Sequence, residues 1–152
     1  MPEWAPDLDH DLAQLVRLQD VMTQPDYKTE YPKTVRRAID VAYAAHFRAL
    51  LEFFHDGRPK GLPLKSDLTF GEVTGEPSPF KPYNTYARQR LEDADKLVGH
   101  LTKLRRTRTS DWGNHSDWQL IWPMIRDLLS RPAVAPLLSE TLAAISSAGL
   151  NV

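Results

Sequence analysis

The segment from Lys33 to His55 constrains the fold most, because its apolar residues recur at the spacing of an α-helix over about six turns. Its apolar face is broad, which is typical of a central helix that neighbouring helices contact on several sides. Gly57 and Pro59 follow it, and both are residue types that end helices. We therefore predict a helix over residues 34–55 at the centre of a helical core. Its apolar face comprises Val35, Ala38, Ile39, Ala42, Tyr43, His46, Phe47, Leu50, Leu51, Phe53 and Phe54.

Four further segments show helical spacing, and together they predict an all-α protein. Asn84 and Ser116 are residue types that cap helix N-termini, and each stands just before one of these segments. Pro123 is expected to kink its helix or to mark a late start. The chain should therefore form a single domain over residues 1–152, an antiparallel bundle of four to five helices. The four segments are residues 6–23, 85–104, 117–129 and 135–146.

Residues 57–84 form one long loop that is rich in Gly and Pro. Within this loop, residues 68–73 are expected to make a short extended piece. A connection of this length is uncommon in a compact domain. Two interpretations remain open, a loop that lies over the surface and a lid over a catalytic site.

Composition excludes several classes of protein. The formal net charge of −1 gives no overall attraction to nucleic acid or to a membrane, so such a partner would need a local patch. Without cysteine there is no disulfide, thiolate metal site or cysteine nucleophile. No apolar run approaches the roughly 18 residues that span a bilayer, and the first residues lack the features of a secretory signal. We expect a cytoplasmic protein without a membrane partner.

Arg48, Glu52 and His55 are the first candidates for catalysis. Arg48 and His55 are seven residues apart, which places them on one helix face about 10 Å from each other. Glu52 lies between them and can pair with Arg48. A histidine can move a proton near neutral pH and an arginine can stabilise a phosphorane, so the pattern suits phosphodiester chemistry. The alternative is a surface ion pair with a histidine that stabilises the helix C-terminus.

His46, His100 and Arg105 are candidates for a polar site between two helices. Both histidines lie on or beside the apolar stripe of their predicted helix, and Arg105 follows shortly after His100. The alternative is a pair of core histidines whose hydrogen bonds are satisfied. The histidines do not pair at the spacing of a helical metal site, and the chain lacks the usual nucleotide and zinc motifs. We therefore predict no metal and no cofactor.

Basic residues gather at two places and are candidates for phosphate or RNA binding. Positive charge at the start of the central helix opposes the helix dipole, so either Glu30 and Asp40 compensate it or an anion does. A second cluster follows residue 102. The alternative is that both clusters are solvated helix ends. The candidates are Lys33, Arg36, Arg37, Arg106 and Arg108.

Two segments resemble a group of prokaryotic proteins with a HEPN-like helical bundle. AYAAHFRALLEFFHDGRP, at Ala42–Pro59, resembles their "HxRNLxxFF" helix, although Ala49 stands where that pattern has Asn. GHLTKLRRTR, at Gly99–Arg108, with Trp112 soon after, resembles their "HLTxxR…W" segment. The resemblance implies an antiparallel helical bundle that is often a homodimer. Active members of the wider superfamily are metal-independent RNases with an Arg and a His a few residues apart, found in toxin–antitoxin and phage-defence systems.

Two functions follow from these observations. The first is a HEPN-like module that forms a homodimer or binds a partner protein, in a defence or toxin–antitoxin setting. The second is a metal-independent ribonuclease, in which Arg48 would stabilise the phosphate and His55 would act as the acid or base. Basic residues would then hold the RNA, among them Lys33, Arg36, Arg105 and Arg106.

Overall fold

The computed structural model describes residues 1–59, 68–99 and 111–152, and these residues are helical or irregular, with no strand among them. The all-α prediction is confirmed. In chain order the described helices are α1 (Ala5–Met22), α2 (Tyr27–Glu30), α3 (Lys33–Phe54), α4 (Phe70–Thr74), α5 (Thr85–Gly99), α7 (His115–Leu129), a short 3-10 turn η1 (Ala135–Leu137) and α8 (Ser139–Ser147).

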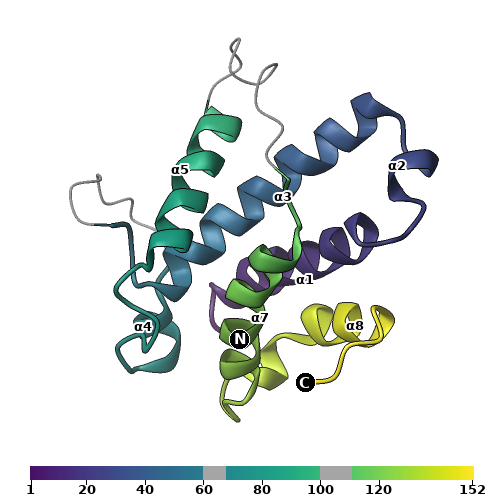
Figure 1. Cartoon of the computed structure of the whole chain (residues 1–152). Coiled ribbons are helices and arrows are strands. Elements are labelled where there is room, and N and C mark those ends of the chain that lie inside the picture. Colours follow the sequence, from purple (N-terminus) through teal and green to yellow (C-terminus); the bar gives the residue numbers. More distant parts are fainter. Residues whose placement is uncertain (60–67, 100–110) are drawn as a thin grey trace.

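Helix α3 runs through the middle of the molecule, between α5 and α1 (Figure 1). Aromatic and branched side chains cover its buried face, and Tyr43, Phe47 and Phe54 are fully buried. Tyr43 and Phe47 stack with their ring centroids 5.6 Å apart. The apolar face of α3 is broad, as expected, because α3 contacts more than one neighbouring helix.

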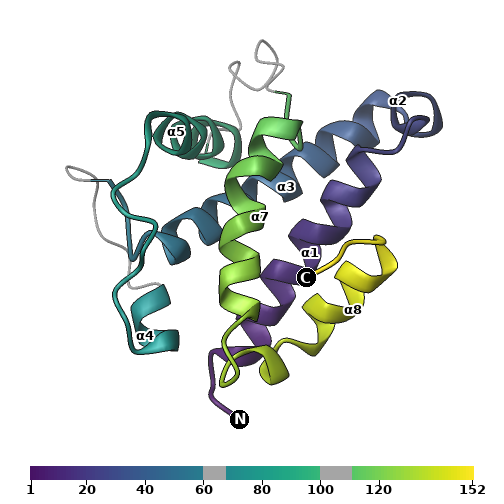
Figure 2. The same cartoon turned by 60° about the horizontal axis from the view of Figure 1, so that its bottom comes forward.

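Helices α7 and α8 complete the core, α7 across α3 and α8 on the other side of α1 (Figure 2). Ile121, Ile125 and Leu128 of α7 are fully buried and belong to the same apolar cluster as the buried residues of α1 and α3. One continuous core therefore holds all the long helices.

The structure corrects the expectation of an extended piece at residues 68–73, because residues 70–74 form helix α4. A capping box explains the helix: the Thr69 hydroxyl accepts from the Glu72 amide, and the Glu72 carboxylate accepts from the Thr69 amide. Phe70 is fully buried, which fixes the short helix to the core. Gly75 ends it with φ of 75°, a left-handed conformation that suits glycine.

Two helix starts also differ from the sequence expectation, and one agrees. The cap of α7 is Asn114, whose side-chain oxygen accepts from the Asp117 amide at 2.8 Å, so the choice of Ser116 is wrong. Helix α8 begins at Ser139, after the turn η1. Asn84 does cap α5, through the Ala87 amide at 2.7 Å. The predicted continuation of this helix to residue 104 lies outside the described residues.

Candidate functional site

Arg48, Glu52 and His55 belong to a polar cluster where the end of α3 meets α5. The cluster also contains Arg58, which follows α3, Tyr83, which precedes α5, and Asp95, which lies on α5. We call these six residues the α3–α5 cluster. Glu52 and His55 are buried, so this face of α3 does not form the surface ion pair considered from the sequence.

Two arginines converge on Asp95 within the cluster. Arg48 Nη1 lies 3.4 Å from Asp95 Oδ1, and Arg58 Nη2 contacts Asp95 Oδ2. Arg58 Nη1 also lies 3.3 Å from Glu52 Oε1. The Arg58 side chain is only 7% exposed, whereas that of Asp95 is 32% exposed. Asp95 is therefore the member of this ion-pair network that solvent reaches most easily.

His55 has a defined tautomer and a lowered pKa. Its Nδ1 lies 2.7 Å from the Leu51 carbonyl oxygen, which can only accept, so Nδ1 carries the proton. In the neutral ring, Nε2 therefore keeps its lone pair. Burial lowers the pKa of His55, which makes the neutral ring the main form at neutral pH. The ring stacks on Tyr83 at 3.9 Å between centroids, and the Tyr83 hydroxyl donates to Gly57 O at 2.8 Å.

A pocket of about 420 Å³ lies beside the cluster, between α1 and α3. Arg48 and Glu52 form part of its wall, and α1 contributes the carboxylates Asp7 and Asp11. Phe53 and Leu68 are among its apolar residues. With these carboxylates around a single arginine, the pocket has no excess of positive charge.

His46 joins α3 to α1 through a hydrogen bond with Asp11, and it is half-buried and not part of the core. Its Nδ1 lies 2.8 Å from Asp11 Oδ1, and its ring contacts the ring of His10 edge to face at 6.1 Å. His100 and Arg105, the other members of the predicted interhelical site, lie outside the described residues.

The predicted basic cluster at the start of α3 lies far from the α3–α5 cluster. From Arg37 to Arg48 the helix rises about 16 Å. Lys33 and Arg37 are exposed, whereas Arg36 is half-buried beside Asp40. The charge of Arg36 lowers the pKa of Asp40, so the two side chains attract each other, and anion binding at this helix start stays a prediction. Arg106 and Arg108 lie outside the described residues.

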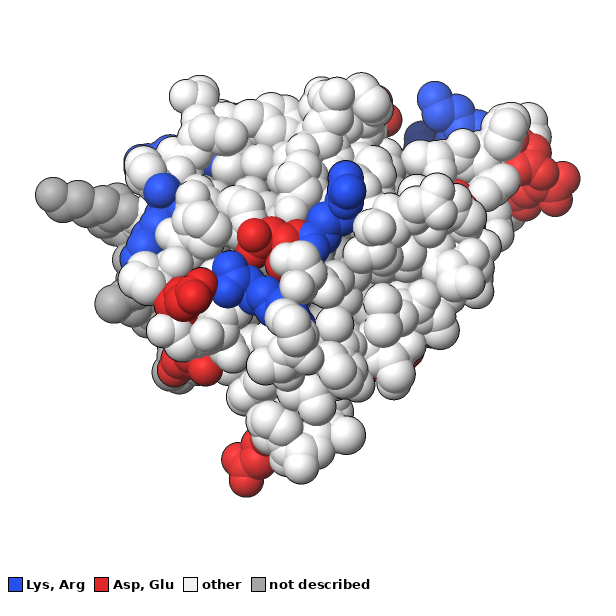
Figure 3. Space-filling model, turned by 90° about the horizontal axis from the view of Figure 1, so that it is seen from below, with Lys and Arg blue, Asp and Glu red and all other residues white. Residues whose placement is uncertain are grey.

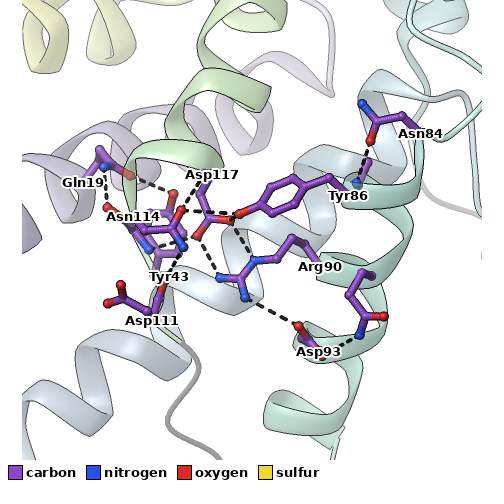
Figure 4. A network of polar contacts seen from close by, with 12 residues as sticks. Gln19, Tyr43, Asn84, Tyr86, Arg90, Asp93, Asp111, Asn114 and Asp117 are labelled. Atoms are coloured by element: carbon purple, nitrogen blue, oxygen red, sulfur yellow. Dashed lines mark hydrogen bonds and ion pairs between the residues drawn. The ribbon is translucent and has the colours of Figure 1, made fainter.

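A second buried network was not foreseen from the sequence. Arg90 of α5 points at Asp117 of α7 and binds it through two hydrogen bonds, of 2.7 and 2.8 Å (Figure 4). The guanidinium also lies over the Trp112 ring, 3.7 Å from its centroid. Tyr86 donates to Asp117 at 2.7 Å, and so does the Gly113 amide at 3.1 Å. Asp117 is fully buried and these donors surround it, which is the arrangement of a structural ion pair.

The same network continues to α1 and α3. Tyr43 donates to Gln19 at 2.7 Å, and Gln19 donates to the Gly113 carbonyl oxygen at 2.8 Å (Figure 4). Four helices are thus fixed to the turn that precedes α7. No sequence signal marks these partners, because each pair is far apart along the chain.

Within the described residues, no group of three or more His, Asp or Glu side chains could hold a metal ion. Nor does any described helix have the length and apolar character to cross a membrane. Comparison with protein families, curated proteins and solved structures found no match for this chain.

Proposed function

We propose that this chain is a HEPN-like helical module that associates with a second copy of itself. The finer architecture that the resemblance implies, an antiparallel bundle of four to five helices, is part of the proposal. The packing of α1 and α5 against α3 supports it. So does the position of the "HxRNLxxFF"-like segment on the central helix.

The observation that carries the proposal is a surface almost without charge. Residues 132–152 contain a single charged side chain, Glu140. In the view from below, a broad uncharged area lies on the side where Figure 1 places α8 (Figure 3). Depletion of charge distinguishes the centre of a protein–protein interface from ordinary surface. The exposed uncharged residues of this segment, here called the C-terminal face, include Pro132, Ala133, Pro136, Ser139, Leu142, Ala143, Ser146, Ser147, Gly149 and Val152.

The one charge of this segment is already used within the molecule. Arg17 donates to Glu140 at 2.7 Å, and His10 lies 3.9 Å from the same carboxylate. Leu142 and Val152 are among the few large apolar side chains that the described residues expose. A second copy could therefore cover this face without leaving an unpaired charge, which would be costly to bury.

Sedimentation equilibrium tests the proposal. The wild-type protein should sediment as a dimer at micromolar concentration, and Leu142→Asp should be monomeric because it replaces an exposed apolar side chain of the face with a charge. Val35→Asp is the matched control, since Val35 on α3 is similarly exposed, at 42% against 38%, but lies outside the face. A monomeric wild-type protein, or equal loss of dimer in both variants, would contradict the proposal.

A second candidate function is a metal-independent ribonuclease. The observation in its favour is that Arg48, Glu52 and His55 share one cluster, in which the neutral His55 keeps a lone pair on Nε2. Such a nitrogen could accept the proton of a ribose hydroxyl while an arginine stabilises the phosphate.

An RNA degradation assay in the presence of a chelator tests this second function. His55→Ala should reduce cleavage by about 100-fold or more, the usual contribution of an acid–base group. Arg48→Ala should reduce it by a similar factor, the usual loss when one group that stabilises transition-state charge is removed. His115→Ala is the control, because His115 is exposed at the start of α7. Equal cleavage by all variants would exclude this role for the cluster.

A further inference from the structure

Asp95 occupies a position in which two guanidinium groups meet. Arg48 and Arg58 approach it from α3 and from the segment after α3, one to each carboxylate oxygen. A guanidinium binds carboxylate and phosphate oxygens with the same geometry. The site of the Asp95 carboxylate is therefore also a site that would hold the oxygens of a phosphate group.

Arg58 has a donor that Asp95 and Glu52 do not use. Its Nε is buried and has no hydrogen-bond partner, although Nη1 and Nη2 are both engaged. A buried donor without a partner is costly, so a group that brought an acceptor to Nε would gain a hydrogen bond. A phosphate has more oxygens than a carboxylate and could satisfy this donor as well.

The position of Asp95 would allow its carboxylate to be replaced by a phosphate group. Asp95 lies on α5, is about one-third exposed and comes from a different element than either arginine. Arg48 is also partly exposed and lines the pocket beside the cluster. An anion can therefore approach Arg48 and Asp95 from solvent, whereas the Arg58 side chain is only 7% exposed. Exchange requires that the Asp95 side chain move away from both arginines.

We propose that Arg48 and Arg58 form a binding site for a phosphate group, which the Asp95 carboxylate fills in the resting protein. Asp95 thus acts as an internal competitor, and the resting site has no excess positive charge because Glu52 also faces Arg58. Removing the charge of Asp95 frees both arginines of the carboxylate that they share, while Glu52 beside Arg58 and the pocket carboxylates Asp7 and Asp11 remain. The inference is independent of self-association and does not require that the protein cleave RNA.

Isothermal titration calorimetry of the full chain with inorganic phosphate tests the site. Asp95→Asn should bind phosphate on the order of tenfold more tightly than the wild type, because one competing charge near the site is lost. Arg48→Ala in the Asp95→Asn background should return the affinity to the wild-type level or below. Glu92→Gln is the matched control, since it removes an exposed carboxylate of the same helix and should leave affinity unchanged.

The proposal is wrong if Asp95→Asn binds phosphate no more tightly than Glu92→Gln does. Should Asp95→Asn fail to fold, the melting temperatures of the wild type and of Arg48→Ala are measured with and without phosphate. Equal stabilisation of both proteins by phosphate refutes the site. Stabilisation of the wild type that is lost in Arg48→Ala supports it. Chloride at matched ionic strength controls for general salt effects.

A separate arm of the experiment asks whether the phosphate group is a free anion or part of an RNA backbone. Titration of Asp95→Asn with inorganic phosphate, and with a short RNA, distinguishes a free anion from a backbone phosphate. Tight phosphate binding without RNA cleavage would support the site and reject the ribonuclease. RNA cleavage that depends on His55 would support the ribonuclease. If Asp95→Asn then binds phosphate no more tightly than the wild type, the phosphate site is rejected.

Discussion

At the scale of single residues, burial determines what the polar side chains of α3 and its neighbours do. Helical spacing predicts that Arg48, Glu52 and His55 share one face, because that spacing depends on α3 alone. Their partners could not be foreseen, since Arg48 reaches Asp95 at a distance of 47 residues along the chain. The orientation of His46 toward Asp11 on α1 escaped prediction for the same reason.

Asp40 should make stability depend on pH. Burial, followed by the charge of Asp111, raises the pKa of Asp40 from 3.8 to about 6, while Arg36 lowers it. Between about pH 4 and pH 6 the folded protein therefore keeps a proton that the unfolded chain has released. The contribution of Asp40 to the free energy of unfolding then falls as pH rises through this window.

Urea denaturation at several pH values measures this effect. Asp40→Asn should gain stability relative to the wild type as pH rises from 4 to 6, and the difference should level off above pH 6. Glu3→Gln, an exposed residue near the N-terminus, is the control for loss of one carboxylate. A difference that does not vary with pH would show that Asp40 titrates normally.

The Arg90–Asp117 pair should contribute strongly to stability because both side chains are buried, at 7% and 0% exposure. Asp117→Ala leaves the Arg90 charge without its main partner and should cost about 3–5 kcal/mol in the free energy of unfolding. Glu92→Ala breaks an exposed pair with Arg88 on the same helix and should cost at most about 0.5 kcal/mol. Similar losses in chemical denaturation of the two variants would contradict a structural role for the buried pair.

At the scale of helices and turns, local signals predict most of the described elements, and tertiary contacts determine the remainder. Apolar periodicity located the long helices to within a few residues, and Asn84 was recognised as a cap. The short helix α4 was missed because residues 68–73 are too few to show a period. Its capping box, Thr69 and Glu72, was the signal that could have identified it.

Helix α8 illustrates a cap that comes from another helix. Asp9 of α1 accepts from the amides of Glu140 and Thr141, at 2.9 and 2.7 Å, and from the Thr141 hydroxyl at 2.7 Å. These amides belong to the first turn, which lacks partners within the helix. The carboxylate also favours the positive end of the helix dipole.

Asp9→Ala should therefore loosen α8 specifically. We expect a loss of about 2 kcal/mol in the free energy of unfolding, the upper end for a helix cap, because one buried and one part-buried amide lose their acceptor. Hydrogen exchange should be faster in the amides of α8 than in those of α3. Asp7→Ala, an exposed residue two positions earlier, is the control. Uniformly faster exchange over all helices would indicate global destabilisation instead of a lost cap.

At the scale of the whole molecule, the arrangement of charge separates the two proposed functions. The net charge of −1 is nearly neutral, and the C-terminal face has one charge that is already paired. Composition alone shows that residues 132–152 contain few charges, but their exposure and their position beside α1 required the structure. The described basic residues that were candidates for binding phosphate or RNA lie elsewhere, at the start of α3 and in the α3–α5 cluster.

Salt should therefore weaken RNA binding much more than it changes self-association. Association through an uncharged face depends on burial of apolar surface, so its dissociation constant should change less than about threefold between 50 and 500 mM NaCl. RNA held by Arg48 and Arg58 should weaken about 25-fold over the same tenfold range, because each neutralised phosphate of a single strand contributes a slope of about 0.7. Sedimentation and fluorescence anisotropy on the same protein preparation give both constants. Self-association that weakens as steeply as RNA binding would mean that charged residues, and not the C-terminal face, hold the two copies together.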